Sequence, residues 1–243
     1  MGKISILMYH QIGEFERPPA HRSTYCHIRR FKAQMAWLYR CGYQVIGLEE
    51  ACEVLFEGKP LKGNAVVLTF DDGYQNFYEQ AFPVLERYGF PATVFLVADL
   101  LGKTSEWLAA DGRPDPPLMD ISIIRQLRRK GVLFGAHTLS HPRLSQIDHE
   151  QMCREVKESK RVLEELLDEK VDYFCYPCGD FDAGVVAAVK DAGYRGALSC
   201  IRASAEAGKV DPFLIPRKAI SFGDSLAGFW WKIHMKHKPK QSV

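Results

Sequence analysis

The most informative part of this chain of 243 residues is the stretch Ala65-Val66-Val67-Leu68-Thr69-Phe70, which is followed directly by Asp71-Asp72-Gly73-Tyr74. Six residues without alternation of apolar and polar side chains predict a strand that is buried on both faces. Sheets built from such strands are parallel and are covered by helices. Two acids therefore stand where a buried parallel strand ends, which is where β/α barrels place their functional residues.

Outward from this strand, short apolar runs alternate with segments of helical periodicity. Further strands are expected at Ile4–Tyr9, 44–48, 92–97, 132–134, 173–176, 197–200 and 213–215, and helices at 49–56, 83–88, 121–130, 148–169, 183–192 and 224–235. This alternation predicts parallel β-α units, either in a doubly wound sheet or in a β/α barrel. About seven strands, with no Gly-x-Gly-x-x-Gly after the first, favour the barrel. We expect one domain over residues 1–243 that ends in a helix and a basic tail at 224–243.

The composition excludes several classes of protein. With 47% apolar and 26% charged residues the chain is neither disordered nor fibrous. A net charge of +2 argues against a general nucleic-acid binder. No apolar run approaches the length of a membrane span, and the apolar stretch at Ile4–Tyr9 is too short for a signal peptide, so we expect a cytoplasmic protein. Seven cysteines, an odd number, are expected to be reduced thiols.

Candidate chemistry begins with the acids Asp71 and Asp72. Two adjacent carboxylates repel one another unless a metal ion or a shared proton compensates, and with a metal ion one acid can bind it while the other acts as a base. Asp-Gly is also a common turn signal, so these residues alone decide little. His137-Thr138-Leu139-Ser140-His141-Pro142 adds two histidines that can converge on one ion, although solvated loop histidines would give the same pattern.

The combination is more specific than its parts. Asp72, His137 and His141 would form a metal site of two histidines and one carboxylate. Each follows a predicted strand, as do His10 and the segment 175–179. Because the carboxyl ends of barrel strands share one rim, we expect all of these segments to meet there.

Thr69–Tyr74 together with His137–Pro142 resembles the polysaccharide deacetylase family, which is carbohydrate esterase family 4 with its NodB homology domain. The resemblance covers most of the chain, from Ile6 to about Phe229. It implies a distorted β/α barrel and a metal-dependent hydrolase that removes an acyl group, usually acetyl, from an N-acylated amino sugar in a glycan or glycolipid. It also implies Asp71 as general base and Asp72, His137 and His141 as ligands of a divalent ion. We expect zinc, with cobalt, nickel or iron as alternatives, and a monomeric enzyme.

The chain departs from the family pattern at two places. The third motif, Arg-x-Pro-x-Gly, aligns with Cys175-Tyr176-Pro177-Cys178-Gly179, so the arginine that steadies the base is replaced by cysteine. The backbone N–H of Cys178 can still form the oxyanion hole, and we predict that Arg217 approaches Asp71 instead. The late Leu-x-His motif, which supplies the general acid, is missing. His10 is the predicted replacement, since one branch of the family begins with a similar Tyr-His.

Two other functions remain as alternatives. Cys175-Tyr176-Pro177-Cys178 has the Cys-x-Pro-Cys form of a thioredoxin-like disulfide oxidoreductase, although the acids and histidines would then be unexplained. A non-catalytic carbohydrate-binding homologue is the second alternative.

Two aromatic features could bind other partners. Residues 229–240 combine aromatic and basic side chains and could contact a membrane surface weakly, although packing of the aromatic residues on the barrel is the more ordinary explanation. Trp107, in a long Gly- and Pro-rich loop, could stack on a sugar ring or simply pack within the loop.

Overall fold

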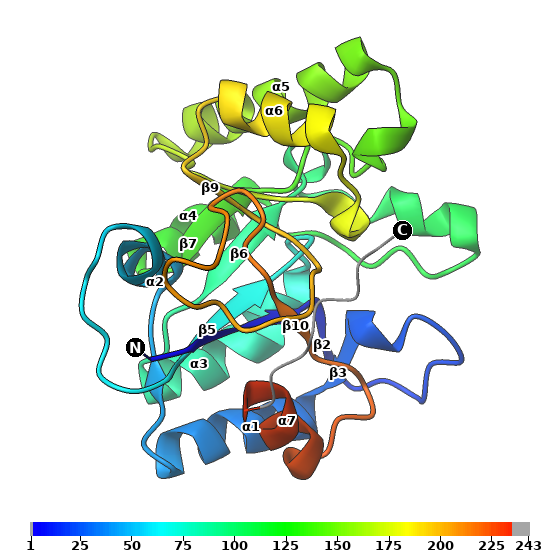
Figure 1. Ribbon diagram of the computed structural model, residues 1–243. Coiled ribbons are helices and arrows are strands. Elements are labelled where there is room, and N and C mark those ends of the chain that lie inside the picture. Colours follow the sequence, from blue (N-terminus) through cyan, green and yellow to red (C-terminus); the bar gives the residue numbers. More distant parts are fainter. Residues whose placement is uncertain (1, 235–243) are drawn as a thin grey trace.

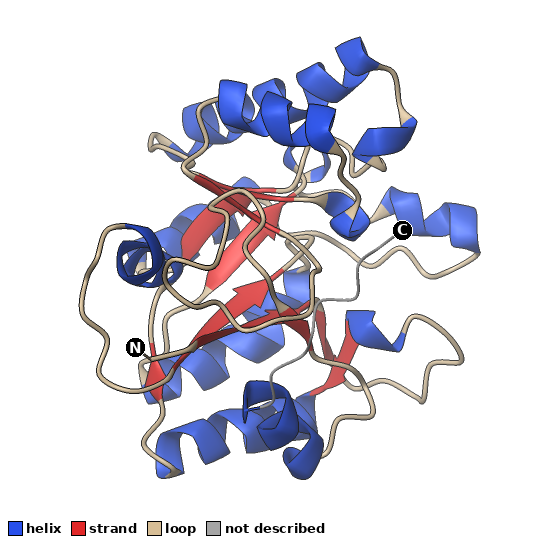
Figure 2. Ribbon diagram, in the orientation of Figure 1, coloured by secondary structure: helices blue, strands red, loops and turns tan. Residues whose placement is uncertain are grey.

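The structure is a computed structural model, and it describes residues 2–234. Within these residues the core is one parallel sheet with helices around it (Figures 1 and 2). Its strands run in the order β10-β1-β5-β6-β7-β8-β9, and β4 pairs with β5 beside this path. Their bounds are β1 Ile4–Tyr9, β4 Gln44–Val45, β5 Ala65–Phe70, β6 Thr93–Leu96, β7 Leu133–Ala136, β8 Tyr173–Cys175, β9 Gly196–Leu198 and β10 Lys218–Ala219.

The strand β5 is buried inside the sheet, as its sequence predicts. All six of its residues are buried, and it pairs in parallel with β1 along its whole length. The sheet curves into a distorted, open barrel, as expected. The two ends of the sheet, β9 and β10, are joined by the segment 199–217 rather than by a direct ladder: Ser199 N donates to Ile215 O, and Arg217 N donates to Ile201 O.

Helices surround the sheet because their apolar stripes need burial. The helices α1 and α7 lie together at one side of the sheet, and α5 and α6 pack against each other at another side (Figure 1). The helix bounds are α1 Ile28–Arg40, α2 Leu48–Phe56, α3 Phe82–Tyr88, α4 Ile121–Arg129, α5 His149–Leu167, α6 Ala183–Asp191 and α7 Leu226–His234. Asp120, Asp148 and Asp182 cap α4, α5 and α6 by accepting hydrogen bonds from backbone N–H groups of the first turn.

Several elements of the structure were not predicted from the sequence. A second, two-stranded parallel sheet, β2 (Gln11–Gly13) with β3 (Tyr25–His27), leads into α1, and neither the sheet nor α1 was expected. The strand expected at 213–215 is wrong: Ile215 makes a single bridge to Leu198, and the last strand is β10. The conformation of such short segments depends on the strands that pack beside them, because two or three residues are too few to show a periodicity.

Up to His234, the C-terminal segment is partly buried. Arg217 and Lys218 are buried, and α7 buries Phe229 and Ile233 while Trp230 and Trp231 stay about half exposed. Residues 235–243, which include most of the expected tail and part of the expected membrane contact, lie outside the described residues. In the part of the chain that the structure describes, no helix combines the length and apolar character needed to cross a membrane.

Candidate metal centre and active site

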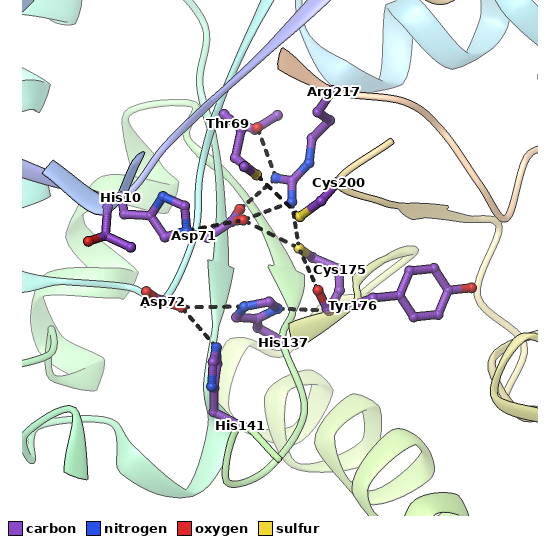
Figure 3. A network of polar contacts seen from close by, with 12 residues as sticks. His10, Thr69, Asp71, Asp72, His137, His141, Cys175, Tyr176, Cys200 and Arg217 are labelled. Atoms are coloured by element: carbon purple, nitrogen blue, oxygen red, sulfur yellow. Dashed lines mark hydrogen bonds and ion pairs between the residues drawn. The ribbon is translucent and has the colours of Figure 1, made fainter. Parts of the chain in front are cut away.

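The predicted site residues meet at the carboxyl ends of the strands (Figure 3). His10 follows β1, Asp71 and Asp72 follow β5, and His137 follows β7. They line a cavity of about 450 Å³, together with His141 and Cys178. Arg217 lies behind the cavity, where its guanidinium contacts Asp71.

Asp72, His137 and His141 form the first cluster. Asp72 Oδ1 lies 3.3 Å from Nε2 of both histidines, and the three candidate ligand atoms lie within 4.8 Å of one another. Asp72 Oδ1 is buried and makes no hydrogen bond of good geometry with the described residues. A buried acceptor facing two imidazole nitrogens fits a divalent cation, because neutral imidazole and carboxylate are ordinary ligands for zinc and similar ions.

The loop that carries the two histidines is held by neighbours. His137 Nδ1 lies 2.7 Å from the carbonyl oxygen of Cys175, which orients the ring so that Nε2 faces Asp72. Thr138 and His141 both have positive φ, 68° in each case, and the Thr138 hydroxyl accepts a hydrogen bond from His141 N. Trp107 stacks on His141 with ring centroids 4.4 Å apart, so one face of the indole is occupied by the imidazole rather than open for a sugar.

Glu155 is a supporting residue that sequence analysis did not single out. This buried side chain from α5 accepts hydrogen bonds from the backbone N–H groups of Leu139 and Ser140, at 2.8 and 3.0 Å, and from the Ser140 hydroxyl. It therefore fixes the centre of the histidine loop. The sequence does contain a sign of this role, because Glu155 is an acid among the apolar residues of the buried face of α5, between Met152 and Val156.

Asp71 and Arg217 form the second cluster. Arg217 donates to both carboxylate oxygens of Asp71, from Nη1 at 2.6 Å and Nη2 at 2.8 Å. Nη2 also lies 3.0 Å from the sulfur of Cys175, and Nε donates to the carbonyl oxygen of Ser199. Arg217 thus approaches Asp71, as the sequence predicts for the residue that replaces the missing arginine. His10 Nε2 lies 3.9 Å from Asp71 Oδ2.

The two acids are held ionised by different partners. Burial alone would raise the pKa of Asp71, but the charge and hydrogen bonds of Arg217 lower it below its ordinary value. Burial likewise opposes ionisation of Asp72, and His137 and His141 bring its pKa well below the ordinary value. Burial alone lowers the pKa of His137, but Cys175 and Asp72 raise it well above the ordinary value. Burial lowers the pKa of His141 and favours its neutral, metal-binding form.

The two cysteines of the Cys-x-Pro-Cys segment differ in environment. Cys175 is buried against Asp71 and Arg217, whereas Cys178 is exposed, and both are free thiols. Cys178 has φ of 57° and lies in a short 3₁₀ turn, while α6 begins only at Ala183. Burial raises the pKa of the Cys175 thiol. A thioredoxin-like pair needs a depressed thiol pKa at a helix N-terminus, so this geometry disfavours the oxidoreductase alternative.

Comparison with known proteins identifies the family. A family model described as polysaccharide deacetylase matches residues 58–197, more than half of the chain, so the chain belongs to the polysaccharide deacetylase family. Named members are N-deacetylases, which are hydrolases acting on carbon–nitrogen bonds.

Individual relatives agree with this assignment. YxkH of Bacillus subtilis is 28% identical over 195 residues, which cover 79% of this chain and 63% of that protein. The poly-beta-1,6-N-acetyl-D-glucosamine N-deacetylase of Escherichia coli is 49% identical over 61 residues, 25% of this chain and 9% of that protein. The chain therefore spans less than two thirds of the length of these curated relatives.

Solved structures show the same fold. The deacetylase PplD of Streptococcus pyogenes, solved in complex with acetate, has a TM-score of 0.80 and 23% identity, and the match covers 96% of this chain and 99% of that one. A polysaccharide deacetylase from Bacillus cereus has a TM-score of 0.76 and 25% identity, covering 95% of this chain and 69% of that one. The NodB-like distorted barrel predicted from the sequence is thereby confirmed.

Proposed function

We propose that this protein is a metal-dependent hydrolase that removes the N-acetyl group from an amino sugar of a glycan or glycolipid, acting as a monomer. The observation that carries the proposal is the pairing of a carboxylate–histidine cluster with a second, arginine-bound carboxylate in one cavity. Members of the family are named for N-deacetylation of poly-beta-1,6-N-acetyl-D-glucosamine, which supports acetyl as the group removed.

Asp72, His137 and His141 would hold the metal ion, with zinc as the expected ion and cobalt, nickel or iron as alternatives. When bound, a divalent cation polarises the amide carbonyl and lowers the pKa of a water molecule. The fit rests on the buried Asp72 oxygen and on the orientation of His137 by the Cys175 carbonyl.

Asp71 would act as the general base that takes a proton from the attacking water. Its place next to Asp72 in the chain puts it beside the cation site, and Arg217 holds it in the ionised form that can accept a proton. Arg217 is a positioning residue, because its guanidinium lies behind Asp71 and is fully buried.

Cys178 and His10 would complete the reaction. The positive φ of Cys178 belongs to a turn at the cavity wall, where its backbone N–H would donate to the oxyanion of the tetrahedral intermediate. His10 also lines the cavity, and its Nδ1 is buried without a hydrogen-bond partner among the described residues. Its Nε2, near Asp71, would give the proton to the leaving amine.

Metal analysis coupled to acetate release tests this function. The protein, stripped of metal and reloaded with zinc, cobalt, nickel or iron in turn, is incubated with a panel of N-acetylated glycans. We expect one bound ion per chain and acetate release that depends on it. A protein that binds glycans but holds no metal and releases no acetate would instead be the non-catalytic homologue.

A further inference from the structure

The cavity beside the catalytic residues has two arginines in its lining, Arg113 and Arg143, that the proposed reaction does not use. A cavity of about 450 Å³ exceeds the needs of one acetamido group and lies in the range of ordinary ligand sites. The cavity therefore has room for parts of a substrate beyond the acetamido group.

Arg143 is the better placed of the two. It lies two residues after His141, it is exposed, and none of the described carboxylates lies within ion-pair distance of its guanidinium. Asp180, in the loop after Cys178, binds Ser145 instead, accepting from its backbone N at 2.8 Å and its hydroxyl at 2.9 Å. Arg143 thus brings an unneutralised cation to the cavity.

The other lining residues do not offset this charge. Among the described residues that line the cavity, the acids are only Asp71 and Asp72. Asp71 is bound at both oxygens by Arg217, and Asp72 faces two histidines. Neither acid is thus available to neutralise Arg143.

We propose that Arg143 binds an anionic group of the glycan, a carboxylate or a phosphate, in a subsite next to the sugar that loses its acetyl group. This inference rests on the proposed function. A guanidinium presents a planar fork of donors that matches carboxylate and phosphate oxygens. Arg143 and Cys178 line the same cavity and interact electrostatically, so the subsite borders the proposed oxyanion hole.

The substrate class follows from this charge. Acidic N-acetylated glycans would be favoured over neutral ones of the same length. Glycans already rich in deacetylated sugars carry ammonium groups, and Arg143 would repel them. The enzyme would thus act early on an acidic chain rather than late on a cationic one.

Sterically matched substrates test the subsite. An oligosaccharide of N-acetylglucosamine and N-acetylmuramic acid is compared with the same oligosaccharide whose carboxylates are converted to carboxamides. A second pair consists of an N-acetylglucosamine oligomer with and without a 6-phosphate. We expect kcat/KM to be about tenfold higher for the anionic member of at least one pair, and the pair that responds tells carboxylate from phosphate.

Variants of Arg143 test whether this residue causes the preference for anionic substrates. In Arg143→Gln the ratio of kcat/KM between the anionic and neutral substrates should fall to about one, and Arg143→Lys should keep part of it. Arg154→Gln, the same charge change on the exposed face of α5, should leave the ratio as in the parent protein. The ratio should also decline as salt is raised, because exposed charges are screened.

Two outcomes would overturn the inference: equal kcat/KM within both pairs, or a preference that Arg143→Gln does not change. If no substrate releases acetate, the proposed function fails, and calorimetric binding of the same four oligosaccharides decides the subsite by itself. Tighter binding of an anionic member, lost in Arg143→Gln, would support it. Equal affinities within both pairs would refute it.

Discussion

The two halves of the site are built in opposite ways. The proposed metal half takes two of its three ligands, His137 and His141, from one short loop with positive φ at His141, and the third, Asp72, from the end of β5. The base half joins Asp71 to Arg217, which is 146 positions away in the chain and is completely buried. The two histidines thus belong to one local motif with strained turns, whereas Asp71 and Arg217 form a long-range ion pair that exists only in the folded barrel.

This difference indicates separate tasks. A local loop can be pulled into shape by a bound ion, since the energy of ligand binding can offset strain of about 1–3 kcal/mol per residue. A buried acid such as Asp71 needs its cation whether or not substrate is present, because an uncompensated charge in the interior is costly. The metal half should therefore govern metal content, and the base half both turnover and stability.

The largest expected effect separates the halves directly. Asp71→Asn should lower turnover by about 10²–10⁴-fold while metal content stays at the parent level, because the base is lost and the ligands remain. His137→Ala should lose both the bound metal and the turnover. Metal content by mass spectrometry and acetate release measure the two effects. Loss of metal in Asp71→Asn would show that the halves are one unit.

Arg217 tests the base half. Arg217→Met leaves Asp71 buried without its cation, so the free energy of unfolding should fall by about 3–5 kcal/mol and turnover should fall with it. Urea denaturation and acetate release measure these changes. Arg161→Met is the control, since that arginine pairs with Glu158 and Glu165 on the surface. Unaltered activity and pH profile in the Arg217 variant would contradict the role given to this residue.

Glu155 tests whether the metal half depends on its loop. Glu155→Gln keeps the shape of the side chain but removes the charge that three donors share, so metal affinity should fall about 10–100-fold. Competition with a chelator measures the affinity. Glu165→Gln, on the exposed face of the same helix, is the matched control. Parent-like affinity would show that the histidine loop holds its shape without this anchor.

The smallest effect concerns Lys218, the neighbour of Arg217. It is buried and bonded to the hydroxyl of Ser204 and the carbonyl oxygen of Ile233, and burial lowers its pKa from 10.5 to about 8. At a pH between these two pKa values, Lys218 is protonated in the unfolded chain but mostly deprotonated in the folded chain. Stability should therefore rise with pH above about 8, by about 1–2 kcal/mol up to about pH 9.5.

Denaturation at several pH values measures this rise. Lys218→Met should flatten it, whereas Lys157→Met, at an exposed position of α5, should not. A rise that persists in Lys218→Met would assign the titration to another group.

The barrel, the buried strand β5 and the cluster of Asp72, His137 and His141 were all predicted from the sequence alone. Five of the six residues of Ala65–Phe70 are apolar, which predicts its continuous burial. Asp72, His137 and His141 follow strands whose carboxyl ends share one rim. Short elements such as β10 escaped prediction because two residues carry no periodicity, and α1 was missed although its buried residues recur at helical spacing.

The support of Asp71 depends on tertiary structure. The sequence indicates Arg217 as a candidate for the position that Cys175 leaves without an arginine, but the bidentate geometry of Arg217 depends on how the segment 199–217 connects β9 to β10. Glu155 and Arg143 carry no motif of their own. Their proposed roles depend on the residues that the fold places beside them. Such contacts between distant segments result from tertiary packing and leave no local pattern in the sequence.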